Sequence, residues 1–189
     1  IFLNEDITLQ DGTVYSVLFQ GKDLADNEGD FLSLRGILYD ISKPIVDLQF
    51  PNTNSFINSN IVSYKLNEDL SFGIIEWIQR DGIPDDQSPH IINLEGSELL
   101  SGEHLFQFLE NSTNLNDGSI YDLKFYGIDK SGNHSDTTIV ENIKYDNTPP
   151  TLLALSPESG SAISSGQIGY RLGEDFSSGE INWSIQGSD

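Results

Sequence analysis

The sequence contains no cysteine and no methionine. Without cysteine, the chain has no disulfide, no thiolate-bound zinc or iron–sulfur cluster and no thiol nucleophile. Basic residues are also scarce, because 9 lysines and arginines stand against 30 aspartates and glutamates, for a formal net charge of -21. Binding of phosphate groups needs lysine and arginine, so this balance argues against nucleic acid and against an anionic membrane surface as partners.

Long hydrophobic runs, helical periodicity and catalytic motifs are absent as well. No stretch of about 18 or more apolar residues occurs, which argues against membrane insertion. There is no HExxH pair, no GxSxG elbow and no Gly-rich phosphate loop. The histidines, His90, His104 and His134, lack metal-ligand spacing, and we interpret the acidic stretch before His90 as a loop rather than a small metal site. The sequence therefore predicts a protein that is not an enzyme.

The strongest signal in the sequence is an internal repeat. Residues 1–83 align without a gap to residues 107–189 at an offset of 106, and 27 of the 83 aligned pairs are identical. The identical pairs include Asp11 and Asp117, Tyr15 and Tyr121, Asp23 and Asp129, Tyr64 and Tyr170, Glu68 and Glu174, and Trp77 and Trp183. This period exceeds the roughly 20–50 residues of solenoid repeats and matches the roughly 100 residues of one β-sandwich domain.

Proline-bearing linkers mark the boundaries between the repeats. The stretch from Tyr39 to Pro44 has its counterpart in the stretch from Tyr145 to Pro150, and proline stiffens such linkers by fixing φ. We therefore divide the chain into the C-terminal part of one domain (1–42), a complete domain (43–148) and the N-terminal part of the next domain (149–189).

Alternation of apolar and polar residues predicts an all-β fold with almost no helix. The expected strands of the complete domain are 45–50, 61–66, 75–79, 120–128 and 139–145, with weaker candidates at 90–94 and 105–109. Trp77 and Trp183 are expected to be buried on the third strand, with a sugar-stacking platform as the alternative. Tyr15 and Tyr121 follow an Asp-Gly turn and are expected to form a tyrosine-corner bond.

Several of these segments resemble a bacterial immunoglobulin-like repeat family. The resemblance rests on the run Val62 to Gly73 followed by Glu76-Trp77, on Ser88-Pro89-His90, on Asn116 to Tyr121, on Asp129 to Asn133, and on the closing Tyr145 to Pro150. It implies tandem immunoglobulin-like β-sandwich domains with a 106-residue repeat, in large secreted or surface proteins that are often adhesins. The fold alone does not define a function, because such domains occur in proteins of many kinds.

Acidic residues are expected to gather at the junctions between these domains. In an immunoglobulin-like sandwich, the loops after the second and sixth strands lie at the end where the chain enters, and the Asp-Gly turn of the preceding repeat approaches the same point. The residues predicted to meet at the first junction are Asp11, Asp40, Glu68, Asp69 and Asp129, and those at the second are Asp117, Asp146, Glu174 and Asp175. Calcium prefers six to eight oxygen ligands, so these are candidate calcium sites. The alternative is that the stretch from Asp129 to Asn133 is an ordinary turn and the carboxylates are merely solvated.

The functional prediction that follows is structural. We expect an extracellular stalk or spacer, secreted or at the cell surface, whose partners are neighbouring copies of the same repeat or a self-assembled filament. The alternatives are an adhesion module that binds a glycan or a cell-surface protein, and an accessory domain of a secreted hydrolase.

Overall fold

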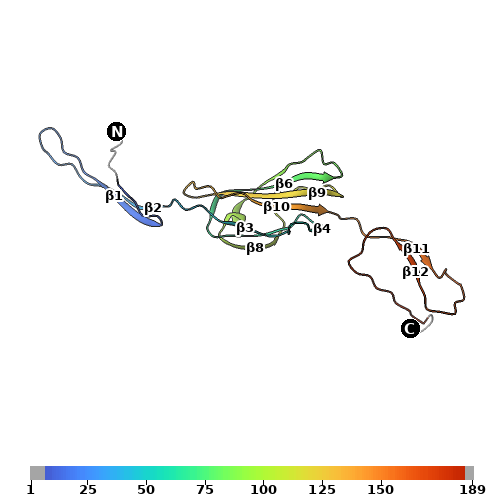
Figure 1. Cartoon of the computed structure of the whole chain (residues 1–189). Helices are drawn as coiled ribbons and strands as arrows, with labels where there is room; N and C mark the ends of the chain where they lie inside the picture. Colours follow the sequence, from blue (N-terminus) through green and yellow to red (C-terminus); the bar gives the residue numbers. More distant parts are fainter. Residues whose placement is uncertain (1–6, 186–189) are drawn as a thin grey trace. The chain divides into compact units, whose positions relative to one another are not determined.

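The computed structural model describes residues 7–185, and nearly all of its regular structure is β (Figure 1). The strands are β1 (Thr13–Phe19), β2 (Leu32–Tyr39), β3 (Val46–Phe50), β4 (Phe56–Ile57), β5 (Val62–Leu66), β6 (Leu70–Gly82), β7 (His90–Asn93), β8 (Gly102–Gln107), β9 (Ser119–Asp129), β10 (Thr138–Tyr145), β11 (Leu152–Ser156) and β12 (Gly169–Leu172). A short 3₁₀ helix, η1 (Gly96–Leu99), is the only helix among the described residues. Nothing in this described range is a helix long and apolar enough to cross a membrane. The predicted all-β class is confirmed.

Strands β3 to β10 form the middle domain, which consists of two sheets (Figure 1). One sheet has the strand order β4-β10-β9-β6-β7 and the other the order β3-β5-β8. All pairs are antiparallel except β10 with β4, which is parallel. The long strands β6 and β9 pair at the centre of the larger sheet, so they carry most of its inward-facing side chains.

Alternating side chains of the two sheets meet in one hydrophobic core. Tyr64 of β5, Trp77 of β6 and Tyr121, Leu123 and Phe125 of β9 are each fully buried. The Tyr64 and Phe125 rings meet edge to face across the two sheets at 5.0 Å. The Trp77 and Tyr121 rings, on neighbouring strands of the larger sheet, also meet edge to face, at 6.2 Å. The prediction that Trp77 serves packing is therefore confirmed.

The repeat in the sequence is matched by a repeat in the local backbone. The bounds of β2 and β10, and those of β3 and β11, differ by the same 106 residues. The backbone N–H of Gln10 donates to the Tyr15 hydroxyl at 2.8 Å, and that of Asn116 donates to the Tyr121 hydroxyl at 2.8 Å, so both predicted tyrosine-corner bonds are confirmed. At these positions, equivalent sequences adopt the same local structure.

The chain divides into two compact units, residues 1–146 and 147–189. The first contains the β1–β2 hairpin and the middle domain. The second, the C-terminal unit, contains the β11–β12 hairpin, and its Trp183 is 62% exposed, so the expected burial of this tryptophan is wrong in the structure. Residues 70–79, the counterparts of 176–185, lie in β6, whereas 176–185 form no strand.

Two strands, β6 and β8, differ from their predicted bounds by more than one residue. β6 begins at Leu70 rather than at residue 75, because Gly73 and Gly127 leave room for the side chains of Leu94 and Leu70 respectively. β8 begins at Gly102 and ends at Gln107, because Phe106 adopts a positive φ of 50° and its N–H donates to the Ser63 hydroxyl. This change of backbone direction ends the regular ladder before residue 109.

Candidate functional site

The linker, residues 40–44, is held by hydrogen bonds from both of its neighbours. On one side, the carboxylate of Asp11, at the turn before β1, accepts the Ile41 N–H at 2.8 Å and the Ser42 hydroxyl at 2.7 Å. On the other side, the loop between β9 and β10 donates to Asp40: Asn133 Nδ2 to the backbone oxygen at 3.1 Å and Ser131 Oγ to the carboxylate at 3.2 Å. The linker is therefore attached to the preceding hairpin and to the middle domain.

The loop from Asp129 to Asn133 is organised around the Asp129 carboxylate, which is only 1% exposed. It accepts the N–H groups of Ser131 at 2.7 Å and Asn133 at 2.8 Å, and the Asn133 side-chain amide at 2.8 Å. Burial acts to raise the pKa of Asp129, but these hydrogen bonds to its ionised form outweigh burial and hold the pKa below its ordinary value. The stretch is therefore a turn in which the aspartate bonds its own backbone, and its carboxylate is buried rather than solvated.

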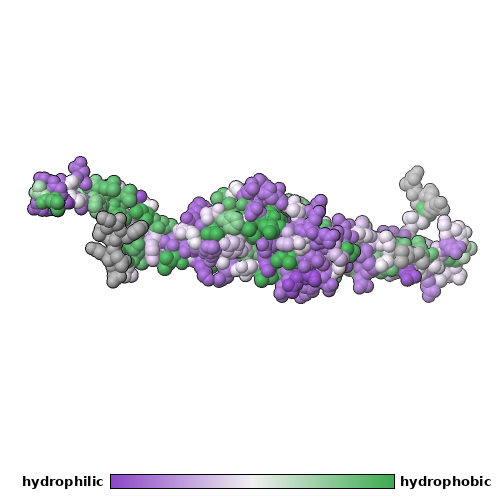
Figure 2. Space-filling view, turned by 90° about the horizontal axis from the view of Figure 1, so that it is seen from above, coloured by the Kyte–Doolittle hydropathy of each residue, from purple (hydrophilic) through white to green (hydrophobic). Residues whose placement is uncertain are grey.

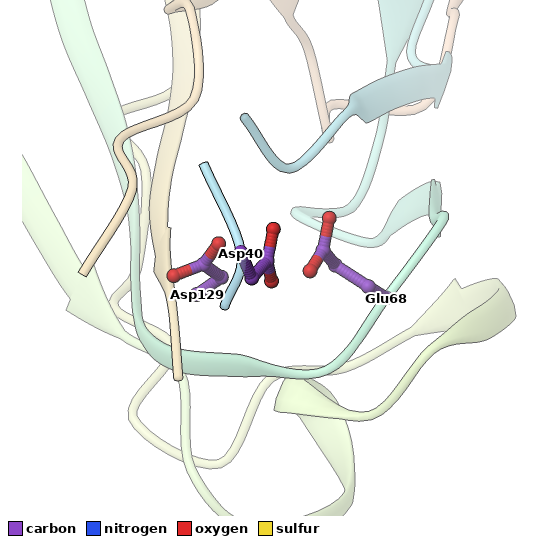
Figure 3. A group of neighbouring side chains, drawn as sticks. All are labelled: Asp40, Glu68 and Asp129. Carbon is purple, nitrogen blue, oxygen red and sulfur yellow. The ribbon is translucent and has the colours of Figure 1, made fainter. Parts of the chain in front are cut away.

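Three carboxylates converge where the linker meets the middle domain. Asp40, Glu68 and Asp129, the acidic triad, each place an oxygen within 4.8 Å of the others (Figure 3). Burial raises the pKa of Glu68, and the negative charges of Asp40, Asp129 and Asp11 raise it further. In the described part of the chain, no lysine or arginine forms an ion pair with the triad. Among the described residues, hydrogen bonds to Asp129 offset part of the negative charge of the triad, but no ion pair does.

Asp69, also predicted at this junction, faces a different set of partners. Its carboxylate accepts the Ser101 N–H at 2.8 Å and the Lys130 ammonium at 2.7 Å. Hydrogen bonds from Lys130 and Ser101 lower the pKa of Asp69 to about 2. The ion pair links the loop after β5 to the loop after β9, so Asp69 joins the two loops instead of joining the triad.

Replacing Lys130 with glutamine is expected to raise the pKa of Asp69 toward its ordinary value of 3.8, because the largest stabilising contact to the carboxylate is weakened. The pKa is measured from the side-chain carboxyl ¹³C shift during an acid titration. The control is Lys65→Gln, which removes a lysine paired with Glu103 elsewhere on the domain. An unchanged Asp69 titration in the Lys130 variant would contradict the ion pair.

The residues predicted at the second junction belong to both compact units and are described separately. Asp117 is half-buried in the turn before β9. Asp146, at the end of β10, donates its N–H to the Ile57 carbonyl at 2.9 Å and pairs with Lys144 at 3.1 Å. Glu174 and Asp175 of the C-terminal unit follow β12 and are exposed.

A second polar group lies at the other end of β9. Asp85 accepts hydrogen bonds from the Tyr121 hydroxyl at 2.5 Å and contacts His90 Nε2 at 2.6 Å. Burial acts to raise the pKa of Asp85, but the hydrogen bonds from Tyr121 and His90 lower it overall. The Asp85 loop is therefore anchored to the tyrosine corner, which agrees with the loop interpretation of this stretch.

The sequence did not identify the polar residues that bond to the linker and to Asp129 as site residues. Ser42, Ser131 and Asn133 hold the carboxylates in place. One signal was available, because the spacing of Asp129 and Asn133 recurs in Asp23 and Asn27 with the same hydrogen bonds.

Chemically, the acidic triad offers only oxygen ligands, the type that hard cations such as Ca²⁺ prefer. An ionised carboxylate has about four lone-pair positions, and Asp129 uses three of them within its loop. Glu68 shares one oxygen with the Asn67 amide at 3.2 Å. The side chains therefore retain acceptor capacity for a cation.

Comparison with known proteins adds no family assignment: neither a protein-family model nor a curated protein matches this chain.

Proposed function

We propose that this chain is a segment of an extracellular stalk or spacer built from tandem immunoglobulin-like β-sandwich domains of a secreted or surface protein. The observation that carries the proposal is the linker, which is bonded to the preceding repeat through Asp11 and to the following domain through Ser131 and Asn133. A spacer must keep a fixed distance between its two ends, whereas a linker without such contacts would be flexible.

Further contacts support a stiff connection. Lys43 pairs with Asp136 of the middle domain at 2.7 Å, and the Ile45 N–H donates to Asn67 Oδ1 at 2.6 Å. The linker residues Ile41 and Ser42, and Ile45 directly after the linker, thus each donate a backbone N–H to a side-chain oxygen. These hydrogen bonds would be lost if the linker changed conformation, so they favour a single conformation of the linker.

Calcium is proposed as a second stiffening element at the same junction. Asp40 is in the linker, whereas Glu68 and Asp129 are in two loops of the middle domain. A cation held by all three would relieve their mutual repulsion and tie the linker more firmly to the domain. Any partners of such a segment would be neighbouring repeats, or further molecules in a filament.

Spin labels on either side of the linker are expected to give a narrow distance distribution. Because the chain has no cysteine, labels are placed uniquely by Ser16→Cys in β1 and Ser97→Cys in η1, both at exposed positions. Adding Asp11→Ala to the labelled chain is expected to broaden the distribution, because two hydrogen bonds to the linker are lost. Pulsed electron double resonance measures the widths, with the exposed Asp30→Ala as control.

Calcium is expected to narrow the distribution further relative to a chelator at equal ionic strength, and Glu68→Gln is expected to remove this response. A broad distribution in the parent chain would overturn the spacer proposal. A narrow distribution that is the same with and without calcium would contradict the calcium proposal but not the spacer proposal.

A further inference from the structure

The outer face of the larger sheet, on the side away from the core, carries a surface depression. Along β6 and β9 the residues Ile75, Trp77 and Phe125 are buried in the core, so the residues that alternate with them lie on the outer face. The depression has a volume of about 320 Å³ and is lined by Ile74, Glu76, Lys124, Tyr126 and Thr137, which we call the outer-face site. Figure 2 looks onto the middle domain from the side of the larger sheet and shows hydrophobic colour with hydrophilic colour around it. This face therefore offers both apolar and polar groups.

The site contains a carboxylate and an ammonium group that do not bond to each other. Glu76 and Lys124 occupy directly opposite positions on β6 and β9. Among the residues that the structure describes, neither side chain forms an ion pair or a hydrogen bond. Exposed isoleucines flank the pair, Ile91 on β7 and Ile139 on β10. One group that only accepts hydrogen bonds and one that only donates them are therefore both available to a ligand.

The aromatic ring of the site is held in place by its neighbours. The Tyr126 hydroxyl hydrogen-bonds with His134 Nδ1 at 3.0 Å, and the two rings lie 5.8 Å apart. On the opposite strand, the Phe72 ring meets the Tyr126 ring edge to face at 6.3 Å. Tyr126 is half-buried, so its orientation is set before a ligand arrives. Binding on this ring therefore costs little side-chain entropy.

The repeat in the sequence does not extend to the polar and aromatic residues of this site. At the offset of 106, the counterparts of Glu76, Lys124 and Tyr126 are Asn182, Leu18 and Gln20. By contrast, the inward-facing Trp77 and Phe125 are identical in the two copies. The framework that the copies share therefore does not depend on the outer-face site, and the site belongs to the middle domain alone.

We infer that the outer-face site binds a neutral sugar residue of an oligosaccharide. The C–H face of a pyranose ring packs on the Tyr126 ring and on Ile74, as apolar surface does on an aromatic side chain. Sugar hydroxyls both donate and accept, so one hydroxyl donates to the Glu76 carboxylate while its neighbour accepts from the Lys124 ammonium. The Thr137 hydroxyl supplies a further polar contact. A few polar groups beside aromatic and aliphatic side chains is the usual make-up of a small-ligand site.

The same features argue against other ligands. An extended peptide adds to a sheet through a free edge, but β6 lies between β9 and β7, and β9 lies between β10 and β6. An anionic ligand would meet the Glu76 carboxylate and a chain with a formal net charge of -21. The sugar site uses none of the linker residues and none of the acidic triad, so it goes beyond the spacer role and does not depend on calcium.

Titration of the ¹⁵N-labelled chain with simple sugars tests the ligand class. The probes are methyl β-D-glucopyranoside, methyl β-D-galactopyranoside, methyl α-D-mannopyranoside and N-acetylglucosamine, with N-acetylneuraminic acid as the anionic comparison. At least one neutral sugar is expected to shift the amide resonances of residues 74–76 and 124–126 in a saturable manner, and the acid is expected to leave them unchanged. No shift with any neutral sugar, shifts confined to other residues, or equal shifts with the acid would overturn the proposal.

The repeat supplies variants of the site that the framework is expected to accept. Tyr126→Gln and Lys124→Leu introduce the residues that stand at the corresponding positions of the other copy. Tyr126→Gln is expected to weaken sugar binding about tenfold, the loss typical of removing an aromatic anchor, and Lys124→Leu is expected to weaken it as well. The control is Phe108→Gln, which removes a 71% exposed aromatic ring outside the site.

The indole resonance of Trp77 in the same spectra shows that each variant is folded. Unchanged affinity in either site variant, or an equal loss in Phe108→Gln, would overturn the proposal. None of these results affects the spin-label distances across the linker, so the sugar site and the spacer proposal fail independently.

Discussion

Replacing Trp77 by alanine is expected to lower the free energy of unfolding of the middle domain by about 3–5 kcal/mol, the range for removing a large aromatic side chain from a core. Trp77 is fully buried and meets the Tyr121 ring at 6.2 Å, so its removal leaves a cavity between the sheets. The same change at Trp183, which occupies the equivalent position of the repeat, is expected to cost less than about 0.5 kcal/mol, as for an exposed site.

The comparison is made by urea unfolding followed by far-ultraviolet circular dichroism, at protein concentrations where the parent chain is monomeric. A Trp77→Phe variant separates the cavity from the loss of the indole, because it retains an aromatic ring at the site. A cost at Trp183 equal to that at Trp77 would contradict the exposure of the C-terminal unit.

Replacing Asp129 by alanine is expected to lower the free energy of unfolding by about 2–4 kcal/mol, because three donors lose a buried, charged acceptor. The matched control is Asp136→Ala in the same domain. Asp136 is 88% exposed and pairs only across the surface with Lys43, so its loss is expected to cost less than about 1 kcal/mol.

The cost of losing Asp129 is also expected to depend on pH. Because the folded-state pKa of Asp129 lies below the ordinary value of 3.8, the ionised carboxylate stabilises the fold fully above that value. This stabilisation is lost as pH falls through the folded-state pKa. Urea unfolding at pH 7 and at pH 3 should therefore show a smaller difference between parent and variant at the lower pH. An unchanged difference would mean that the carboxylate charge contributes nothing.

The strands of the middle domain could be predicted because their apolar residues alternate. Tyr121, Leu123 and Phe125 face the core, and the intervening Asp122 and Lys124 do not. The full length of β6 could not be predicted, because it depends on Gly127, where a side chain would collide with Leu70 on the neighbouring strand. Such a contact between distant residues leaves no local pattern in the sequence.

The candidate site could be predicted in part. Topology alone indicated that the linker, the loop after β5 and the loop after β9 meet, and Asp40, Glu68 and Asp129 are indeed close together. The direction of individual side chains could not be predicted. Glu68 and Asp69 are neighbours in one loop, yet Asp69 turns to Lys130 and Ser101. Asp11 bonds the linker backbone, and only its charge reaches Glu68.

The hydrogen bonds from Asn133 and Ser131 to Asp40 determine where a recombinant chain that contains the middle domain should begin. A chain that begins at residue 43, where the proline-bearing linker suggests a boundary, would lose Asp40, which accepts hydrogen bonds from the Asn133 amide and the Ser131 hydroxyl. A chain that begins at residue 39 would keep both of these hydrogen bonds. It would lose only Asp11, so the Ile41 N–H and the Ser42 hydroxyl would bond to water instead. A chain that is to keep these contacts of the middle domain therefore has to include the last residue of β2, Tyr39, ahead of the linker.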